Sequence, residues 1–188
     1  EVYAEWAPNE KVALEVAAGA SYGGARALCC MKHVGLNVAA DPLFTASYTG
    51  VNGGLVILVA DDPGMHSSQN EQDSRFYARS AHVPMLEPAD SGEAKEFIKA
   101  AFGLSERFDT PVLVRSNTRI SHSRGIVEVE ERREVPLKEY QKDIKKYVMM
   151  PGMAKGRHII VEQRMKDIAE YAETADLNRA EYADAEIG

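Results

Sequence analysis

Hydrophobic residues recur along this chain in two patterns, one typical of amphipathic helices and one of buried strands. Apolar residues three or four positions apart predict helices, which we expect over residues 9–22, from 36 onward, and over 70–80, 91–107 and 158–174. Short continuous apolar runs predict buried strands, over residues 26–30, 55–60, 83–86 and 111–115. Because strands and helices alternate, the sequence predicts an α/β fold with a mainly parallel sheet.

Three further features concern the first 42 residues. Residues 1–6 have the composition of a strand, and residues 31–35 that of a turn. The pair Asp41-Pro42 is expected to break or restart the helix that begins near Leu36, since proline disfavours a helix interior.

The chain changes character near Val127, where it becomes rich in charge and poorly periodic. We expect a strand end there, followed by a linker. The sequence therefore predicts an α/β domain over residues 1–131. Residues 132–188 are expected to form a linker and helix that lead to a further domain.

Composition excludes several classes of protein. The 188 residues are 45% hydrophobic and 27% charged, which suits one soluble domain of ordinary size. The net charge of -7 argues against a protein that binds a phosphate backbone. No apolar run approaches the roughly 18 residues of a membrane-spanning helix. We expect neither nucleic acid nor a membrane as a partner.

Cys29 and Cys30 are the only cysteines, and they are adjacent. Neighbouring residues of a strand point to opposite faces, so a shared metal ion or a disulfide is not expected. Free cysteines suit a reducing cytoplasm, which is the expected location. An iron–sulfur cluster needs about four cysteines, so none is expected within this chain.

An acidic residue lies on the apolar face of the first predicted helix. Glu10 shares that face with Ala13, Leu14 and Ala17, and Asn9 is a suitable N-cap. One interpretation is that the helix dipole favours a carboxylate in the first turn. The other is that Glu10 faces a ligand and acts on its protons. The spacing alone leaves both open.

Polar side chains follow three of the predicted strands at the points where the strands end. They are Lys32, His33 and Asn37 after the first core strand, Asp61, Asp62 and residues 66–70 after the second, and Asn117, Thr118, Arg119, Ser121 and His122 after the fourth. Ligands of open parallel sheets bind at the carboxyl ends of the strands. We therefore expect these side chains to meet at one edge of the sheet.

Each of these groups of polar residues also has an explanation that involves no ligand. Lys32 and His33 suit a solvated turn, and residues 70–73 suit a helix N-terminus with capping acids. Arg119 and His122 could hold their own loop through hydrogen bonds. The sequence alone does not separate these explanations from a binding site.

Other chemistries fit the sequence poorly. A hydrolase built on His66, Ser67 and Asp73 would lack the G-x-S-x-G motif. A zinc site formed by His33, His66 and His122 would have no recognised ligand spacing. The glycines near residues 19–24 do not form the G-x-G-x-x-G fingerprint of dinucleotide binding.

Several ordered motifs resemble a known family. The pattern E-x-x-A-x-x-x-A-x-G, here Glu10, Ala13, Ala17 and Gly19, precedes ARALCC and MKHVGLN, and resembles the pyrimidine-binding domain of thiamine-diphosphate enzymes. The stretches ADDPGMHSSQNEQDSRFYA and TRISHSRG resemble the 2-oxoacid:ferredoxin oxidoreductases. The run as a whole is similar to the alpha subunits of those that act on indolepyruvate. This implies the thiamine-diphosphate-binding fold, a three-layer sandwich, whose first elements would precede this chain.

The resemblance also implies roles for the site residues. In thiamine-diphosphate enzymes the glutamate that matches Glu10 hydrogen-bonds the aminopyrimidine ring nitrogen, so Glu10 is the expected catalytic and cofactor-binding residue. The expected substrate-binding residues are Lys32, His33, His66 and Arg119. The other expected cofactor-binding residues are Asn37, Ser67, Gln69 and Asn70. No metal ligand is expected.

The same resemblance implies an activity for the complete enzyme. It would oxidatively decarboxylate arylpyruvates, indolepyruvate among them, to acyl-CoA, with ferredoxin as electron acceptor. The expected partners are the 2-oxoacid, coenzyme A, ferredoxin and a beta subunit. The alternatives are another 2-oxoacid:ferredoxin oxidoreductase, a non-oxidative thiamine-diphosphate decarboxylase, and a non-catalytic α/β interaction module.

Two family motifs are missing from this sequence. The G-D-G motif that binds diphosphate and magnesium is absent, and so are the cysteine runs that hold 4Fe-4S clusters. Thiamine diphosphate and magnesium are therefore expected to be shared with a domain outside this chain. The clusters are expected elsewhere in the full subunit, and this chain alone is expected to be inactive.

Overall fold

A computed structural model describes residues 2–180 and places a parallel sheet at their centre. The strands are β1 (Ala27–Lys32), β2 (Leu55–Asp61), β3 (Met85–Leu86) and β4 (Val112–Asn117). They lie in the order β1-β2-β4-β3, and each neighbouring pair is parallel. The four strands predicted from continuous apolar runs are confirmed, and β2 and β4 occupy the centre of the sheet.

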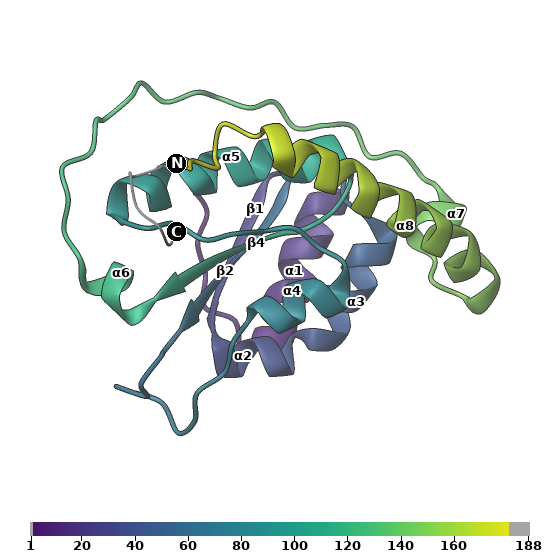
Figure 1. Cartoon of the computed structure of the whole chain (residues 1–188). Coiled ribbons are helices and arrows are strands. Elements are labelled where there is room, and N and C mark those ends of the chain that lie inside the picture. Colours follow the sequence, from purple (N-terminus) through teal and green to yellow (C-terminus); the bar gives the residue numbers. More distant parts are fainter. Residues whose placement is uncertain (1, 181–188) are drawn as a thin grey trace.

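Helices cover both faces of the sheet, as Figure 1 shows. They are α1 (Glu10–Tyr22), α2 (His33–Val38), α3 (Ala40–Thr49), α4 (Arg75–Ala81), α5 (Ser91–Phe108), α6 (Thr118–His122), α7 (Ile144–Tyr147) and α8 (Pro151–Thr174). One hydrophobic cluster joins the sheet to α1, α2, α3 and α4, and a second joins it to α5. The predicted α/β fold with three layers is confirmed.

The helix caps follow the sequence prediction. The Asn9 side chain accepts a hydrogen bond from the amide of Val12 at 3.0 Å, and Asp90 caps α5 in the same way through Glu93 at 2.8 Å. The core-facing side of α1 buries Leu14. Glu10 is therefore placed, as expected, at the start of a helix packed on the sheet.

Two predictions near the N-terminus are wrong. Residues 2–6 form no strand, because no neighbouring strand pairs with them; Glu1 lies outside the described residues. Residues 31–35 form no turn, since β1 continues to Lys32 and α2 begins at His33. The sheet ladder extends β1, so its last side chain reaches further toward the carboxyl edge.

Three helix boundaries also differ from the prediction. The break falls at Ala39 rather than at Asp41-Pro42, because Pro42 lies in the first turn of α3, where a missing N–H costs little. Helix α4 begins only at Arg75, because the carboxylate of Asp61 binds the preceding residue. Helix α8 begins at Pro151, a favoured first position for proline.

Residues 123–143 form a long connection without regular structure, visible in Figure 1 as an arc over the molecule. The strand end expected near Val127 is wrong, since no strand of the described residues pairs there. The connection is tied down at Lys138, whose amide donates to the carbonyl of Gly24 at 3.1 Å.

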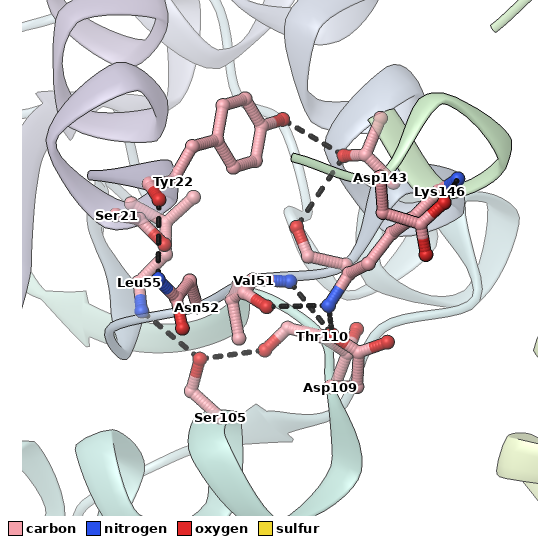
Figure 2. Close-up of polar contacts among 12 residues, drawn as sticks. Ser21, Tyr22, Val51, Asn52, Leu55, Ser105, Asp109, Thr110, Asp143 and Lys146 are labelled. Carbon is pink, nitrogen blue, oxygen red and sulfur yellow. Dashed lines mark hydrogen bonds and ion pairs between the residues drawn. The ribbon is translucent and has the colours of Figure 1, made fainter. Parts of the chain in front are cut away.

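Helices α7 and α8 are fastened to the edge of the sheet where the strands begin. Figure 2 shows Lys146 Nζ donating to the carbonyl of Val51 at 2.7 Å and to Oδ1 of Asp109 at 2.8 Å. On α8, Val161 is fully buried, whereas Ile159 is 72% exposed. The expected apolar stripe of this helix is therefore only partly right, because buried arginines occupy part of the contact face.

The division of the chain at residue 131 stays a prediction. The contacts of α7 and α8 join the two predicted parts, and residues 181–188 lie outside the described residues. Across residues 2–180, no helix combines the length and apolar character needed to cross a membrane.

Candidate functional site

Glu10 lies at the first position of α1, half-buried, with its side chain against α2. A Cβ on Gly35 would lie 2.5 Å from Cγ and 2.9 Å from Oε1 of Glu10, so only glycine leaves room for this side chain. Within residues 2–180, no hydrogen bond or ion pair holds the Glu10 carboxylate. It is an acceptor without a protein donor, next to the end of β1.

Glu10 also influences the neighbouring strand. The pKa of the Cys29 thiol is raised to about 11, first by burial, then by Cys30 and Glu10. Cys29 is buried, whereas Cys30 is exposed on the opposite face of the strand. The thiol of Cys29 therefore stays protonated at neutral pH, as expected for a packing residue.

The side chains at the end of β1 reach the loop that follows β2. Lys32 Nζ donates to the carbonyl of Ser67 at 2.6 Å and lies 3.9 Å from Oδ2 of Asp62. His33 is 1% exposed, and its Nε2 lies 3.3 Å from the carbonyl of Asn70. Its other ring nitrogen, Nδ1, is buried and has no hydrogen-bond partner among the described residues. Both residues thus hold the backbone of this loop.

Asp62 is the centre of the loop after β2. Its carboxylate accepts hydrogen bonds from the amides of His66 at 3.2 Å and Ser67 at 2.8 Å, and from the Ser68 hydroxyl at 2.7 Å. Thr118, after β4, donates to it at 2.6 Å. The pKa of Asp62 is lowered well below its usual range, first by the Thr118 bond and next by the Ser68 bond. Asp62 therefore joins the ends of β2 and β4.

The adjacent carboxylate, Asp61, points into a buried ionic network. It accepts a hydrogen bond from Arg115 Nε at 2.6 Å and another from the amide of Ser74 at 3.0 Å. Arg115 also donates to Glu87, which in turn binds Arg75. The two ends of the loop between β2 and α4 are thus fixed to the sheet.

A hollow of about 500 Å³ opens beside this loop. Its lining residues are Pro63, His66, Asn117, Thr118, Arg119 and His122. The structure thus brings His66, after β2, beside Arg119 and His122, after β4. These groups can bind an anionic or hydrogen-bonding ligand.

The remaining predicted site residues lie in the same region with different exposures. Asn37 is exposed and accepts a hydrogen bond from the Tyr77 hydroxyl. The Asn70 side chain accepts a bond from Gln72 at 2.8 Å. The side chains of Ser67 and Gln69 are exposed and make no hydrogen bond in the part of the chain that the structure describes.

The alternative chemistries gain no support from this geometry. Asp73 bonds to Arg75 rather than to a histidine, so it does not orient a base for Ser67. Between residues 2 and 180, no three His, Cys, Asp or Glu side chains are placed to hold one metal ion. His33 is instead engaged by the loop backbone.

Two important residues were missed in the sequence. Gly35 carries no signal by itself, because its need for a missing side chain appears only when Glu10 is placed beside it. Asp62 was noted only as a polar residue at a strand end. Four donors from the following loop and from Thr118 show that it organises the site.

Asp62→Asn is expected to lower stability at neutral pH and to flatten its loss in acid. The pKa of Asp62 is lower in the folded than in the unfolded state. Its stabilising effect is therefore fully present above the unfolded pKa of about 4, and is lost as the pH falls through the folded pKa. Urea unfolding at several pH values measures this. Asp41→Asn is the control, because that carboxylate is 75% exposed. If the stability of Asp62→Asn depends on pH as that of the original chain does, Asp62 is not the carboxylate that holds this loop.

Comparison with known proteins identifies the family. The family model described as pyruvate flavodoxin/ferredoxin oxidoreductase, thiamine diphosphate-binding, matches residues 2–188. The indolepyruvate oxidoreductase subunit IorA of Methanothermobacter marburgensis is 49% identical over 186 residues, covering 98% of this chain and 30% of that protein. The IorA of Archaeoglobus fulgidus is 44% identical, covering 100% of this chain and 30% of that protein.

A solved structure supports the same fold. The 2-oxoglutarate:ferredoxin oxidoreductase from Magnetococcus marinus matches with a TM-score of 0.65 and 14% identity, over 88% of this chain and 36% of that chain. The chain spans about a third of the length of these relatives. With the family match over residues 2–188, the resemblance in the sequence is confirmed: the chain belongs to the thiamine-diphosphate-binding family of pyruvate flavodoxin/ferredoxin oxidoreductases.

Proposed function

We propose that this chain is the pyrimidine-binding part of a thiamine-diphosphate-dependent 2-oxoacid:ferredoxin oxidoreductase, with Glu10 as the residue that contacts the cofactor. The observation that carries the proposal is the Glu10 carboxylate, half-buried against Gly35 with no donor from the described residues. Because no described residue donates to it, this carboxylate is available to a ligand, and a hydrogen bond to a charged acceptor is stronger than one between neutral groups. An aminopyrimidine ring with a protonated nitrogen fits this donor requirement.

Thiamine diphosphate, when bound, supplies the carbanion chemistry of decarboxylation, and the protein controls position and protons. Glu10 holds the proton at the pyrimidine ring nitrogen as a carboxylate acceptor. The helix that carries it is fixed by the Asn9 cap and by the burial of Leu14. Gly35 leaves the space that the Glu10 side chain occupies against α2.

The substrate end of the site is assigned to the loop after β2 and the hollow beside it. Lys32, His66 and Arg119 supply positive or hydrogen-bonding groups for the 2-oxoacid carboxylate. Because His33 is buried, we assign it to holding Asn70 rather than to direct substrate contact. Asn37, Ser67, Gln69 and Asn70 remain proposed cofactor contacts.

The complete enzyme is assigned from the relatives. Its substrate would be indolepyruvate, after the name of the 44–49% identical relatives, with coenzyme A and ferredoxin as further reactants. A beta subunit, magnesium at the diphosphate and 4Fe-4S clusters would be supplied outside this chain, so the chain alone would be inactive. A cytoplasmic location accords with two free cysteines.

Gly35→Ala in the complete enzyme, meaning the full-length subunit with its natural partners, is the experiment that tests this function. The new Cβ displaces the flexible Glu10 side chain, so activity should fall at least about tenfold while the fold is kept. The assay is the arylpyruvate-dependent reduction of a viologen dye with coenzyme A, magnesium and thiamine diphosphate. Melting temperature is measured on the same samples.

Gly19→Ala is the matched control, because a Cβ at that helical position meets nothing within 4 Å. This variant should keep its activity and gain stability, by about 0.5–1 kcal/mol. Full activity of Gly35→Ala would contradict the placement of the cofactor beside Glu10. If the protein is a non-catalytic module, neither the original enzyme nor either variant will reduce the dye.

A further inference from the structure

The segment around α7 and the first half of α8 differs in charge from the rest of the chain. Residues 141–160 contain five Lys or Arg and one Asp, a net charge of +4. Since the whole chain carries -7, the other residues together carry -11. This segment thus carries a net positive charge in an acidic chain, and it lies away from the carboxyl edge of the sheet and the proposed active site.

A groove lies between α7 and α8 in this basic segment, with a volume of about 480 Å³. Its lining residues are Asp143, Lys145, Lys146, Gly152, Met153, Gly156, Arg157 and Ile160. Gly152, Gly156 and Ile160 are four residues apart, so they share one face of α8. A Cβ on either glycine would meet nothing within 4 Å, which leaves open space along the helix.

Several apolar side chains of the same segment are exposed, and one of them, Ile160, lines the groove. The exposed large hydrophobic residues of the segment are Ile144, Val148, Met150, Ile159 and Ile160. Single exposed apolar residues are ordinary, but several within one short segment beside a groove indicate an interaction surface. The groove lining carries three cations against one Asp, beside exposed apolar side chains, which is the composition of a site for an acidic and partly apolar ligand.

The groove is held rigidly in place. Arg157, in its wall, donates to the carbonyl of Tyr48 at 2.6 Å and lies 3.2 Å from Oδ2 of Asp109. Lys146 binds the same carboxylate at 2.8 Å. The Lys145 side chain, by contrast, makes no hydrogen bond or ion pair among the described residues and is available to a ligand. A preformed surface lowers the ordering cost of binding.

We propose that this groove docks an acidic segment of a partner protein, which inserts a bulky apolar side chain between α7 and α8. Complementary charge attracts such a segment, and the groove accepts the side chain. A membrane surface fits less well, because the second half of α8 carries Glu162, Asp167, Glu170 and Glu173, which anionic lipids repel. The proposal is independent of the function assigned to Glu10.

The binding of a fluorescent acidic peptide to the 188-residue chain tests the proposal. The probe is a short glutamate-rich peptide with a central Leu-Phe pair, measured by fluorescence anisotropy. We expect saturable binding that weakens at least about tenfold in Lys145→Glu and in Gly156→Leu. Gly156→Leu fills the groove and favours the helix, so its melting temperature should not fall.

Lys166→Glu is the matched control, because it makes the same charge change on an exposed part of α8. It should bind the probe like the original chain. Equal weakening by both reversals, or equal binding of a peptide with Ala-Ala in place of Leu-Phe, would overturn the proposal. So would binding to phosphatidylserine vesicles in place of the peptide, or a dimer of this chain that Gly156→Leu dissociates.

Discussion

Replacing Glu10 by Gln in the complete enzyme is expected to lower turnover at least about a hundredfold while the fold is kept. Gln has the same size and can still accept a hydrogen bond, but it carries no negative charge to hold a proton at the pyrimidine nitrogen. Proton-transfer catalysis of this kind contributes about 10²–10⁴ in rate. The loss should appear in the rate of thiazolium proton exchange as well as in turnover, because both need this proton.

The stability of Glu10→Gln separates the two interpretations of the residue. A half-buried carboxylate with no donor from residues 2–180 contributes little to stability, so its removal should leave the melting temperature unchanged or higher. A simple first-turn charge would behave in the opposite way, with a loss of about 0.3–1 kcal/mol and full activity. Glu15→Gln, on an exposed position of α1, is the control for a carboxylate without a site.

A lowered melting temperature with normal proton exchange in Glu10→Gln would refute the catalytic assignment. The active site would then have to be built from the loop after β2 and the hollow beside it. The Gly35→Ala variant supplies an independent check, since it leaves the carboxylate chemically intact and changes only its position.

The elements that local pattern determines were predictable from the sequence. The start of α1 follows from a capping Asn before an apolar helical stripe, and β2 from an unbroken apolar run. Because the strands are parallel, their carboxyl ends were expected to meet at one edge of the sheet. The hydrogen bonds from Lys32 to Ser67 and from Thr118 to Asp62 join these ends. These features were predictable because they depend on residues close in the sequence or on the order of strands in the sheet.

The features that depend on contacts between distant segments were not predictable. Helix α4 starts late because Asp61 binds Ser74, thirteen residues along the chain, and no local rule places that bond. The sequence suggested that His33 is an exposed turn residue, yet it is buried, because β1 extends two residues further than predicted and the loop carbonyl of Asn70 lies against the His33 ring. Polar residues can be satisfied in many ways, so their partners emerge only from the fold.

Helix α8 shows the same limit most clearly. Charged residues usually lie on the solvated face of a helix, yet two of those in α8, Arg157 and Arg164, are buried against the end of α3. The last carbonyl groups of α3 have no partners within their own helix and face these guanidinium groups. A sequence pattern treats arginine as a surface residue, whereas here it caps the C-terminus of another helix, where a positive charge is favourable.

Arg164→Ala is therefore expected to destabilise the 188-residue chain by about 2–4 kcal/mol. Arg164 is 4% exposed and donates to the carbonyls of Ser47 at 2.7 Å and Asp109 at 2.8 Å. Its removal leaves two carbonyl groups without a donor, each at a cost of about 1–3 kcal/mol. Burial lowers the pKa of Arg164 to about 10, because the buried charge is poorly solvated. Removal of this charge in Arg164→Ala therefore offsets part of the stability lost with the two hydrogen bonds.

Thermal unfolding measures this effect as a fall of roughly 4–16 °C in melting temperature. Lys166→Ala, on the exposed side of the same helix, removes a charge without a buried contact and should change the melting temperature by less than about 2 °C. If both variants melt like the original chain, α8 is not held against α3 in solution. If Arg164→Ala alone is destabilised, the last helix is part of the same cooperative unit as the sheet, since loss of its contacts lowers the stability of the whole.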